Sequence, residues 1–134
     1  MFNDRCLHYV LDARGRPVQQ PDALAWSQWF ETSHEERIVA KTYIGDVEVS
    51  TVFLGLDHNF SGHGEPILWE TMVFGGPLDE ECDRYRSLAT AIRRHQHFVR
   101  RVQQRMPKAK LVHMPRANPI DERLTRPISL DLVE

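Results

Sequence analysis

The part of the sequence with the clearest capacity for chemistry is the arginine-rich stretch 84–116. It contains ten lysines and arginines and no aspartate or glutamate, together with His95, His97 and His113. Guanidinium groups bind phosphates and carboxylates through paired hydrogen bonds, so the predominance of arginine over lysine favours defined anion contacts. The stretch therefore predicts an anion-binding surface for an acidic protein or a nucleotide-type ligand, with nucleic acid as an alternative partner.

The basic side chains recur at a spacing that places them on one side of a helix. At 100° per residue they form a broad ridge opposite an apolar stripe. Phe98 is expected to project among the arginines, which favours an interface. The predicted partner- or anion-binding residues are Arg86, Arg93, Arg94, His97, Phe98, Arg101 and Arg105.

Charge is distributed unevenly along the chain, which leaves two other interpretations of the ridge open. Residues 1–80 carry 13 acidic and 5 basic side chains, whereas residues 81–134 carry 12 basic and 6 acidic ones. The ridge could be a solvated helix face whose charge the acidic part of the chain offsets. It could also meet the acidic face of a second copy. The net charge of −2 and the pI near 6.4 weigh against nucleic acid, because nucleic-acid-binding domains are commonly strongly basic.

The loop 57–65, DHNFSGHGE, is a second candidate site. Asp57, His58, His63 and Glu65 offer the nitrogen and oxygen ligands that zinc or iron accepts. Their spacing matches no established metal motif, and a loop rich in glycine cannot reproduce the helical H-E-x-x-H pair. A polar loop whose side chains bond to its own backbone is the main expectation, with no cofactor. A metal-dependent hydrolase is the alternative function.

Two further groups of residues could take part in a site. Trp26, Trp29, Phe30 and Trp69 are expected in the hydrophobic core, and a ligand-stacking pocket built from them is the alternative. Glu70 lies in an apolar strand, where it either faces solvent or is a buried carboxylate with a raised pKa.

These residues must be positioned by strands, a short helix and a long helix. Alternating β-branched and apolar residues predict strands in the first part of the chain, and Gly45-Asp46 predicts a hairpin turn. A proline followed by an acid at positions 21–22 predicts the start of a short helix. The expected strands are 6–12, 37–44, 47–56 and 67–74.

From Leu78 to Arg105 the apolar residues recur every three or four positions, without glycine or proline. This predicts an amphipathic helix of about 28 residues, with acids in its first turn and arginines in its last, as the helix dipole favours. Such a helix exceeds what the core of a ~100-residue domain can cover, which predicts a homodimer.

The chain of 134 residues is 41% hydrophobic and 27% charged, a composition typical of one globular domain. The expected fold is α+β: a three- to five-stranded antiparallel sheet packed by a short helix and one long C-terminal amphipathic helix. This domain spans residues 1–106, and a Pro-rich C-terminal arm spans 107–134. No apolar run approaches membrane-spanning length, and the N-terminal segment lacks the pattern of a signal peptide, so no membrane partner is expected.

Several segments together resemble a family of small uncharacterised proteins encoded by tailed phages and prophages. They are Y-V-L-D at 9–12, W-S-Q-W-F-E at 26–31, TVFLGLDH at 51–58 and ETMVFGG at 70–76, within a similarity that covers residues 8–100. The resemblance implies a setting in the cytoplasm of a bacterial host cell and brings no particular activity. The sequence thus predicts a non-enzymatic phage accessory protein that binds an anionic partner. A structural or assembly protein is a further alternative.

Overall fold

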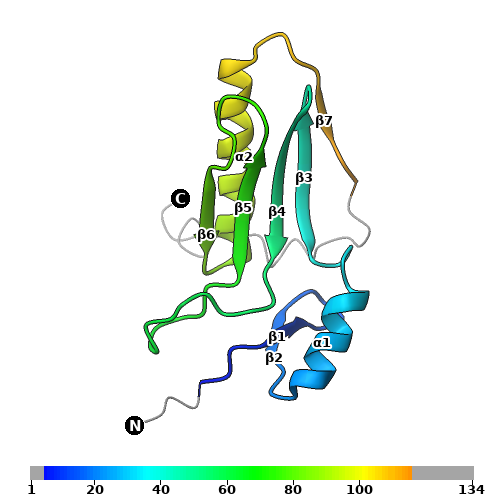
Figure 1. Cartoon of the computed structure of the whole chain (residues 1–134), viewed down its shortest axis with the longest axis vertical. Coiled ribbons are helices and arrows are strands. Elements are labelled where there is room, and N and C mark those ends of the chain that lie inside the picture. Colours follow the sequence, from blue (N-terminus) through cyan, green and yellow to red (C-terminus); the bar gives the residue numbers. More distant parts are fainter. Residues whose placement is uncertain (1–4, 116–134) are drawn as a thin grey trace, which may run out of the picture.

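The computed structural model describes residues 5–115, which form a five-stranded antiparallel sheet, a separate two-stranded hairpin and two helices. The sheet has the strand order β6-β5-β4-β3-β7, and β1 and β2 pair with each other below it (Figure 1). The predicted α+β architecture is confirmed. The elements are β1 (Tyr9–Leu11), β2 (Pro17–Gln19), α1 (Ala23–Thr32), β3 (Ile38–Ile44), β4 (Val47–Phe53), β5 (Trp69–Phe74), β6 (Cys82–Tyr85), α2 (Leu88–Arg105) and β7 (Leu111–His113).

The central strands form because their side chains alternate between buried and solvent-facing positions, as β-structure requires. Every second residue of β4, from Val47 to Phe53, is buried. The predicted turn at Gly45-Asp46 joins β3 to β4. A register shift between Ile38 and Ala40 places Val39 in the core. Strict alternation along the strand would instead put Val39 on the same face as the half-buried Lys41.

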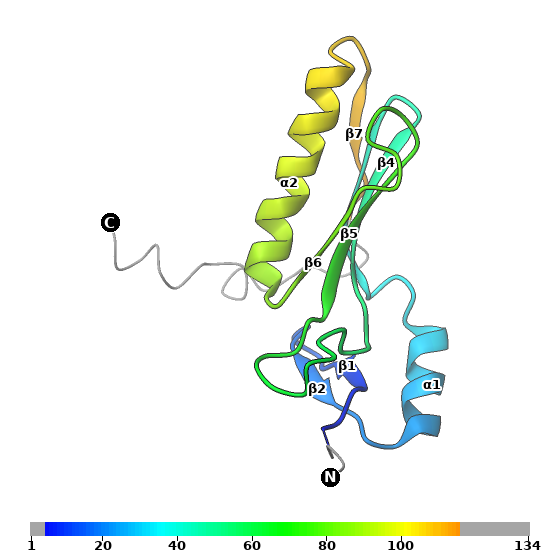
Figure 2. The ribbon, with the colours of Figure 1, turned by 60° about the vertical axis from the view of Figure 1, so that its left-hand side comes forward.

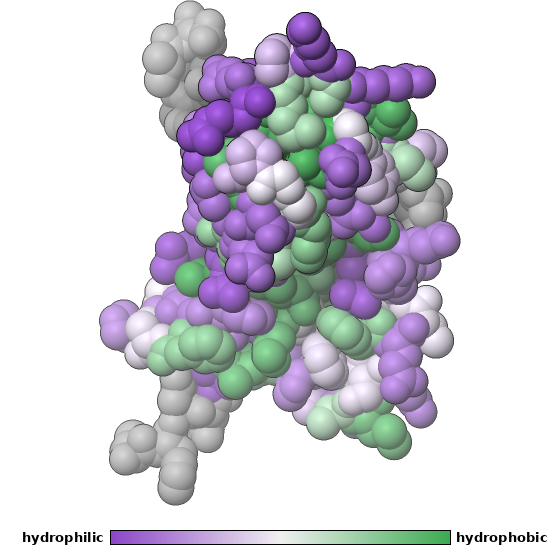
Figure 3. Space-filling view, turned by 45° about the horizontal axis from the view of Figure 1, so that its top comes forward, coloured by the Kyte–Doolittle hydropathy of each residue, from purple (hydrophilic) through white to green (hydrophobic). Residues whose placement is uncertain are grey.

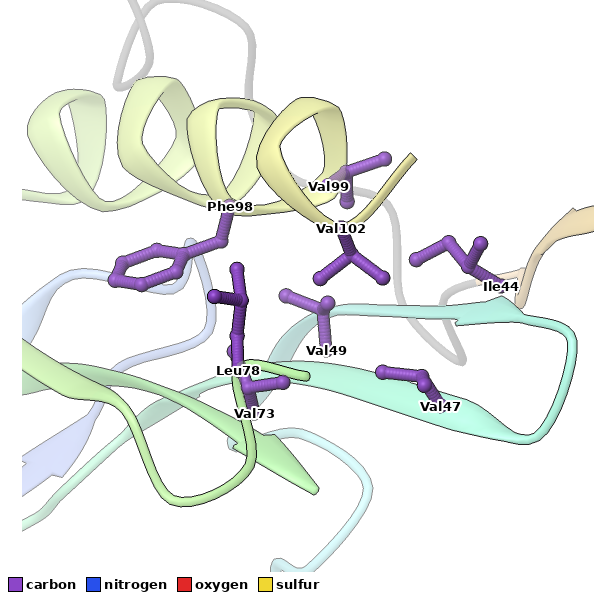
Figure 4. Packing of buried hydrophobic residues seen from close by; sticks show 8 residues of the cluster. All are labelled: Ile44, Val47, Val49, Val73, Leu78, Phe98, Val99 and Val102. Atoms are coloured by element: carbon purple, nitrogen blue, oxygen red, sulfur yellow. The ribbon is translucent and has the colours of Figure 1, made fainter. Parts of the chain in front are cut away.

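One face of the sheet is covered by α2, which runs along the strands (Figure 2). Phe98, Val99 and Val102 of the helix point toward the strands, where they meet apolar side chains of β3, β4 and β5 (Figure 4). Each of these helix residues is nearly or completely buried, and burying an aliphatic or aromatic side chain contributes about 1.5–3 kcal/mol. The cluster contains Ile44, Val47, Val49, Val73, Leu78, Phe98, Val99 and Val102.

The short helix α1 lies beyond the ends of the sheet strands and packs against the β1–β2 hairpin (Figure 2). Asp22 caps it, because its carboxylate accepts hydrogen bonds from the backbone N–H groups of Leu24 and Ala25. Trp26 fixes the helix to the hairpin, since its indole N–H donates to the carbonyl oxygens of Tyr9 and Gly55 at 3.0 and 2.9 Å.

The long helix is shorter than the sequence predicted. It spans 18 residues and begins at Leu88, whereas residues 82–85 form the edge strand β6 beside β5. Ser87 sets the start, because its side chain accepts a hydrogen bond from the backbone N–H of Thr90. The acids at 79–83 are therefore not in a first helical turn. The long helix of 78–105, from which a homodimer was predicted, is therefore not present within the described residues.

The segment after α2 returns to the sheet. β7 pairs antiparallel with β3 at its edge, and the backbone N–H of Met114 donates to the carbonyl of Lys41. The start of the predicted arm thus adds a strand. Residues 128–133, whose alternating apolar side chains would suit an edge strand, lie outside the described residues. No helix in the part of the chain that the structure describes is long and apolar enough to cross a membrane.

Candidate anion-binding surface

The outward face of α2 carries a row formed by Arg93, His97 and Arg100, which we call the outer row. These residues lie on the side of the helix opposite its buried residues Phe98 and Val102. Arg93 and Arg100 are exposed and His97 is half-buried. Neither arginine forms an ion pair within residues 5–115. Arg93 and His97 share one face of the helix, and Arg100, which was not among the predicted residues, lies there as well.

Two of the predicted binding arginines form ion pairs with acidic side chains of the same chain. Arg101 contacts Glu81 through two hydrogen bonds of 2.8 and 3.1 Å, and Arg94 lies 3.5 Å from the carboxylate of Asp83. Glu81 precedes β6 and Asp83 belongs to it, so both acids lie on one flank of α2. The positive charge of this flank is partly offset, so the outer row is the more strongly basic part of the surface.

Phe98 is buried, with 3% of its surface exposed, and the prediction that it projects among the arginines is wrong. The predicted helix phase was set by Leu78, Cys82 and Tyr85, none of which belongs to the helix. The arginines nevertheless contact it from above. The guanidinium carbons of Arg94 and Arg101 lie 5.7 and 5.5 Å from the centre of the Phe98 ring, within the range of cation–π attraction.

The pKa of His97 reflects the positive charges around the outer row. Loss of solvation lowers the pKa of His97 below its ordinary value of 6.5, and repulsion by neighbouring arginines lowers it further. The arginines responsible are Arg94, Arg101 and Arg100. Proton binding at His97 is disfavoured because the ring already lies in a positive field, which is the property that attracts an anion.

Arg86 precedes α2, so the prediction that it lies on the helix face is wrong, whereas Arg105 lies on the helix as predicted. Arg86 is exposed between β6 and α2, and Arg105 is exposed in the last turn of α2, where its charge acts on Glu81. Figure 3 shows the molecule with the end where α2 finishes tilted toward the viewer. Hydrophilic side chains gather around the edges of this view, and apolar ones are visible in its middle.

The loop 57–65 is not arranged as a metal site. Asp57 is fully buried, and its Oδ1 accepts hydrogen bonds from the backbone N–H groups of Asn59 and Ile67. Its Oδ2 accepts from Arg5 Nε at 2.9 Å and lies 2.8 Å from Arg5 Nη2. The carboxylate holds the two ends of the loop together, and these contacts occupy both of its oxygens.

The remaining loop residues follow the expectation of a polar loop bonded to its own backbone. Asn59 Nδ2 donates to the carbonyls of His63 and Glu65, and His58 Nδ1 donates to the carbonyl of Leu56. Within residues 5–115 no three histidine, cysteine or acidic side chains are grouped so that they could hold a metal ion. The loop extends away from the sheet (Figure 1) and exposes Phe60.

Glu70 lies near Cys82, and loss of solvation together with the Glu70 carboxylate raises the pKa of the Cys82 thiol. Glu70 lies on the face of the sheet opposite α2 and forms an ion pair of 2.9 Å with Arg84 on the neighbouring strand. Its side chain is 15% exposed and its charge is paired, so Glu70 is a half-buried carboxylate on the sheet face away from α2. Cys6 and Cys82 are free thiols, the first half-buried and the second exposed.

A chain of hydrogen bonds that was not predicted from the sequence is buried beneath α2. His95, 1% exposed, has Thr42 Oγ1 at 2.8 Å from Nε2 and Thr51 Oγ1 at 2.7 Å from Nδ1. Thr42 continues to His113 Nδ1 at 2.8 Å, and Thr51 to Thr71 Oγ1 at 2.6 Å. Threonines at buried positions of β3, β4 and β5 were the available signal, because a buried hydroxyl needs a partner.

Comparison with protein-family models, curated proteins and solved structures finds no match for this chain. The resemblance to the phage family therefore rests on the sequence segments that suggested it.

Proposed function

We propose that this chain is a non-enzymatic accessory protein of a tailed phage that binds an acidic protein partner through the outward face of α2. The observation that carries the proposal is the outer row of Arg93, His97 and Arg100. Its arginines are exposed and make no ion pair within the described residues. Their charges are available to carboxylates of a partner, and guanidinium groups bind carboxylates in a planar, two-pronged geometry.

The shape of this face favours a macromolecular partner over a free nucleotide. Sites for small molecules are concave and bury most of the ligand, whereas the outward face of a single helix is convex. A protein surface can lie along such a face and reach all three residues of the outer row at once.

The acids beside the arginines favour a protein over nucleic acid. Glu81 and Asp83 lie along one flank of α2, paired with Arg101 and Arg94. A phosphate backbone is uniformly negative, so these acids would repel it. A protein partner has charges of both signs and can place cations of its own against them.

The test compares binding to poly-L-glutamate with binding to a DNA duplex by fluorescence anisotropy. Arg93→Glu/Arg100→Glu is the test variant, and Arg14→Glu/Lys41→Glu is the control, because both change the net charge by −4 and neither control position lies on α2. We expect wild type and control to bind polyglutamate in a salt-dependent manner and the test variant to bind about ten-fold or more weakly. Circular dichroism checks that all three proteins fold.

Equal binding by all three proteins would overturn the assignment to the outer row. Binding of the duplex in preference to polyglutamate, lost in Arg93→Glu/Arg100→Glu, would keep the surface and replace the protein partner by nucleic acid.

A further inference from the structure

A cavity of about 430 Å³ lies near the N-terminal end of α2. It is bounded by the β1–β2 turn, the end of α1, the start of β3 and the first residue of α2. Its volume lies in the range of small-ligand sites, about 300–1,000 Å³. None of the arginines of α2 lines it, so it is separate from the anion-binding surface.

Three aromatic side chains from three different elements line the cavity: Trp29, Phe53 and Trp69. The ring of Phe53 lies 6.2 Å from Trp29 and 5.7 Å from Trp69 between centroids, at interplanar angles of 82° and 61°. Phe53 and Trp69 are almost fully buried, with 1% and 5% exposed. Packing therefore holds these two rings in place before any ligand arrives and leaves little of either ring accessible, whereas Trp29 is half-buried and has more accessible surface.

The rim of the cavity has more negative than positive charge. It contains Asp12, Glu35, Glu36 and Arg14. The charge of Asp12 is used within the β1–β2 hairpin. Its carboxylate accepts hydrogen bonds from the backbone N–H groups of Arg14 and Arg16 and forms an ion pair with the Arg16 side chain at 3.1 Å. With Asp12 neutralised in this way, two carboxylates face one guanidinium.

The two glutamates follow α1 on one side of the cavity. Both are exposed, and the side chain of Glu35 makes no hydrogen bond or ion pair within residues 5–115. Its carboxylate is therefore available to a ligand. Glu36 attracts Arg37, whose guanidinium stacks on Phe30 at 3.7 Å from the ring centre and does not line the cavity.

We propose that this cavity binds a small organic cation of the alkylammonium class. The negative faces of aromatic rings attract an ammonium group within about 6 Å, and the carboxylates at the rim add long-range attraction. The alkyl part would contact the aliphatic walls formed by Leu11, Val39 and Leu88. A neutral ligand of the same shape would make the apolar contacts alone. The proposal is independent of the function assigned to α2.

The test uses choline and its neutral isostere 3,3-dimethylbutan-1-ol, which replaces the quaternary nitrogen by carbon. Binding is followed by NMR through the three indole N–H signals. Trp29 and Trp69 line the cavity, whereas the N–H of Trp26 is bonded to Tyr9 and Gly55 and serves as the internal control. We expect choline to shift the Trp29 and Trp69 signals saturably, and the neutral alcohol to bind at least about five-fold more weakly.

Two variants separate the contributions. Glu35→Gln/Glu36→Gln should weaken choline binding several-fold, whereas Glu31→Gln/Glu65→Gln, with the same change of charge away from the cavity, should leave it unchanged. Trp29→Leu should remove most of the binding, while Phe60→Ala, at an exposed loop aromatic, should not. The absence of a saturable shift in wild type would overturn the proposal, and so would equal affinity for choline and the alcohol. If Trp29→Leu fails to fold, the glutamate pair decides alone.

Discussion

Arg101 and Glu81 are joined by two hydrogen bonds, Nη1 to Oε1 at 2.8 Å and Nη2 to Oε2 at 3.1 Å, across 20 residues of sequence. Glu81 belongs to the turn before β6, and Arg101 lies in the second half of α2. The pair ties the helix to the edge of the sheet. It also withdraws one arginine from the anion-binding surface, so the strongest exposed positive charge lies in the outer row.

The Arg101–Glu81 pair predicts a pH dependence of folding stability. The hydrogen bond from Arg101 lowers the pKa of Glu81 below its ordinary value of 4.5, against a smaller opposing effect of burial. A carboxyl whose pKa is lower in the folded state stabilises the fold above its unfolded pKa, and this stabilisation is lost as the pH falls through the folded pKa. Glu81→Gln should therefore be less stable than wild type near neutral pH.

Urea denaturation of wild type and Glu81→Gln, at neutral pH and well below pH 4.5, checks this prediction. The difference between the two free energies of unfolding should be present at neutral pH and shrink toward zero in acid. Glu31→Gln, an exposed acid on α1 without an ion pair within the described residues, should show no such pattern. A pH-independent difference for Glu81→Gln would contradict the prediction.

His97 reports the positive potential that Arg94, Arg101 and Arg100 create at the outer row. Arg100→Gln removes one of the charges that lower the pKa of His97, so it should raise that pKa toward 6.5. Polyglutamate bound to the surface should also raise it, because nearby carboxylates favour the charged ring. An NMR titration of the His97 ring protons measures both changes. A pKa that stays unchanged with saturating polyglutamate would show that the ligand does not reach the outer row.

Local sequence signals predicted the helices and the central strands, but they did not predict where α2 begins. The capping Asp22 and the alternation in β4 predicted α1 and the central hairpin, because both signals depend on neighbours in sequence. The start of α2 was misplaced because Leu78, Cys82 and Tyr85 continue a helical spacing by coincidence. Strand β6 forms through pairing with β5, a long-range contact that local periodicity does not contain.

The dependence on local sequence also explains which parts of the candidate site could be predicted. Arg93 and His97 were predicted correctly as neighbours on one face, since residues three and four apart on a helix lie together. The partners of Arg94 and Arg101 come from β6 and the turn before it, so their neutralisation required the fold. The cavity brings together Trp29 and Trp69, which are 40 positions apart in sequence. The sequence alone therefore could not decide whether these tryptophans belong to the hydrophobic core or line a ligand pocket.

The buried chain through His95 should contribute to stability. Thr51→Val keeps the shape of the side chain but removes the hydroxyl that lies between Thr71 and His95 Nδ1. Losing a hydrogen-bond partner in the interior costs about 1–3 kcal/mol. Ser50→Ala, at the neighbouring half-buried position on the opposite face, should change the free energy of unfolding by less than about 0.5 kcal/mol. Thermal or urea denaturation compares the two variants, and equal effects would contradict the structural role of the chain.

Gly76 is required by both its backbone and its neighbour. Its φ is +71°, and a Cβ placed there would lie 2.5 Å from Val47 Cγ2 in the core. Gly76→Ala should therefore lower stability by about 1–2 kcal/mol from the left-handed backbone and by about 1–3 kcal/mol more from overpacking. Gly15→Ala, with φ +80° and open space around it, should show the backbone cost alone. A Gly76→Ala variant no less stable than Gly15→Ala would contradict the close contact with Val47.

The most direct test of the central claim is capture of a protein from a bacterial host lysate on three immobilised proteins. These are wild type, Arg93→Glu/Arg100→Glu and the equally charged control Arg14→Glu/Lys41→Glu, with bound proteins identified by mass spectrometry. We predict that wild type and control retain the same acidic protein, released by salt, and that Arg93→Glu/Arg100→Glu does not. Retention of the same protein by all three would contradict binding through the outward face of α2.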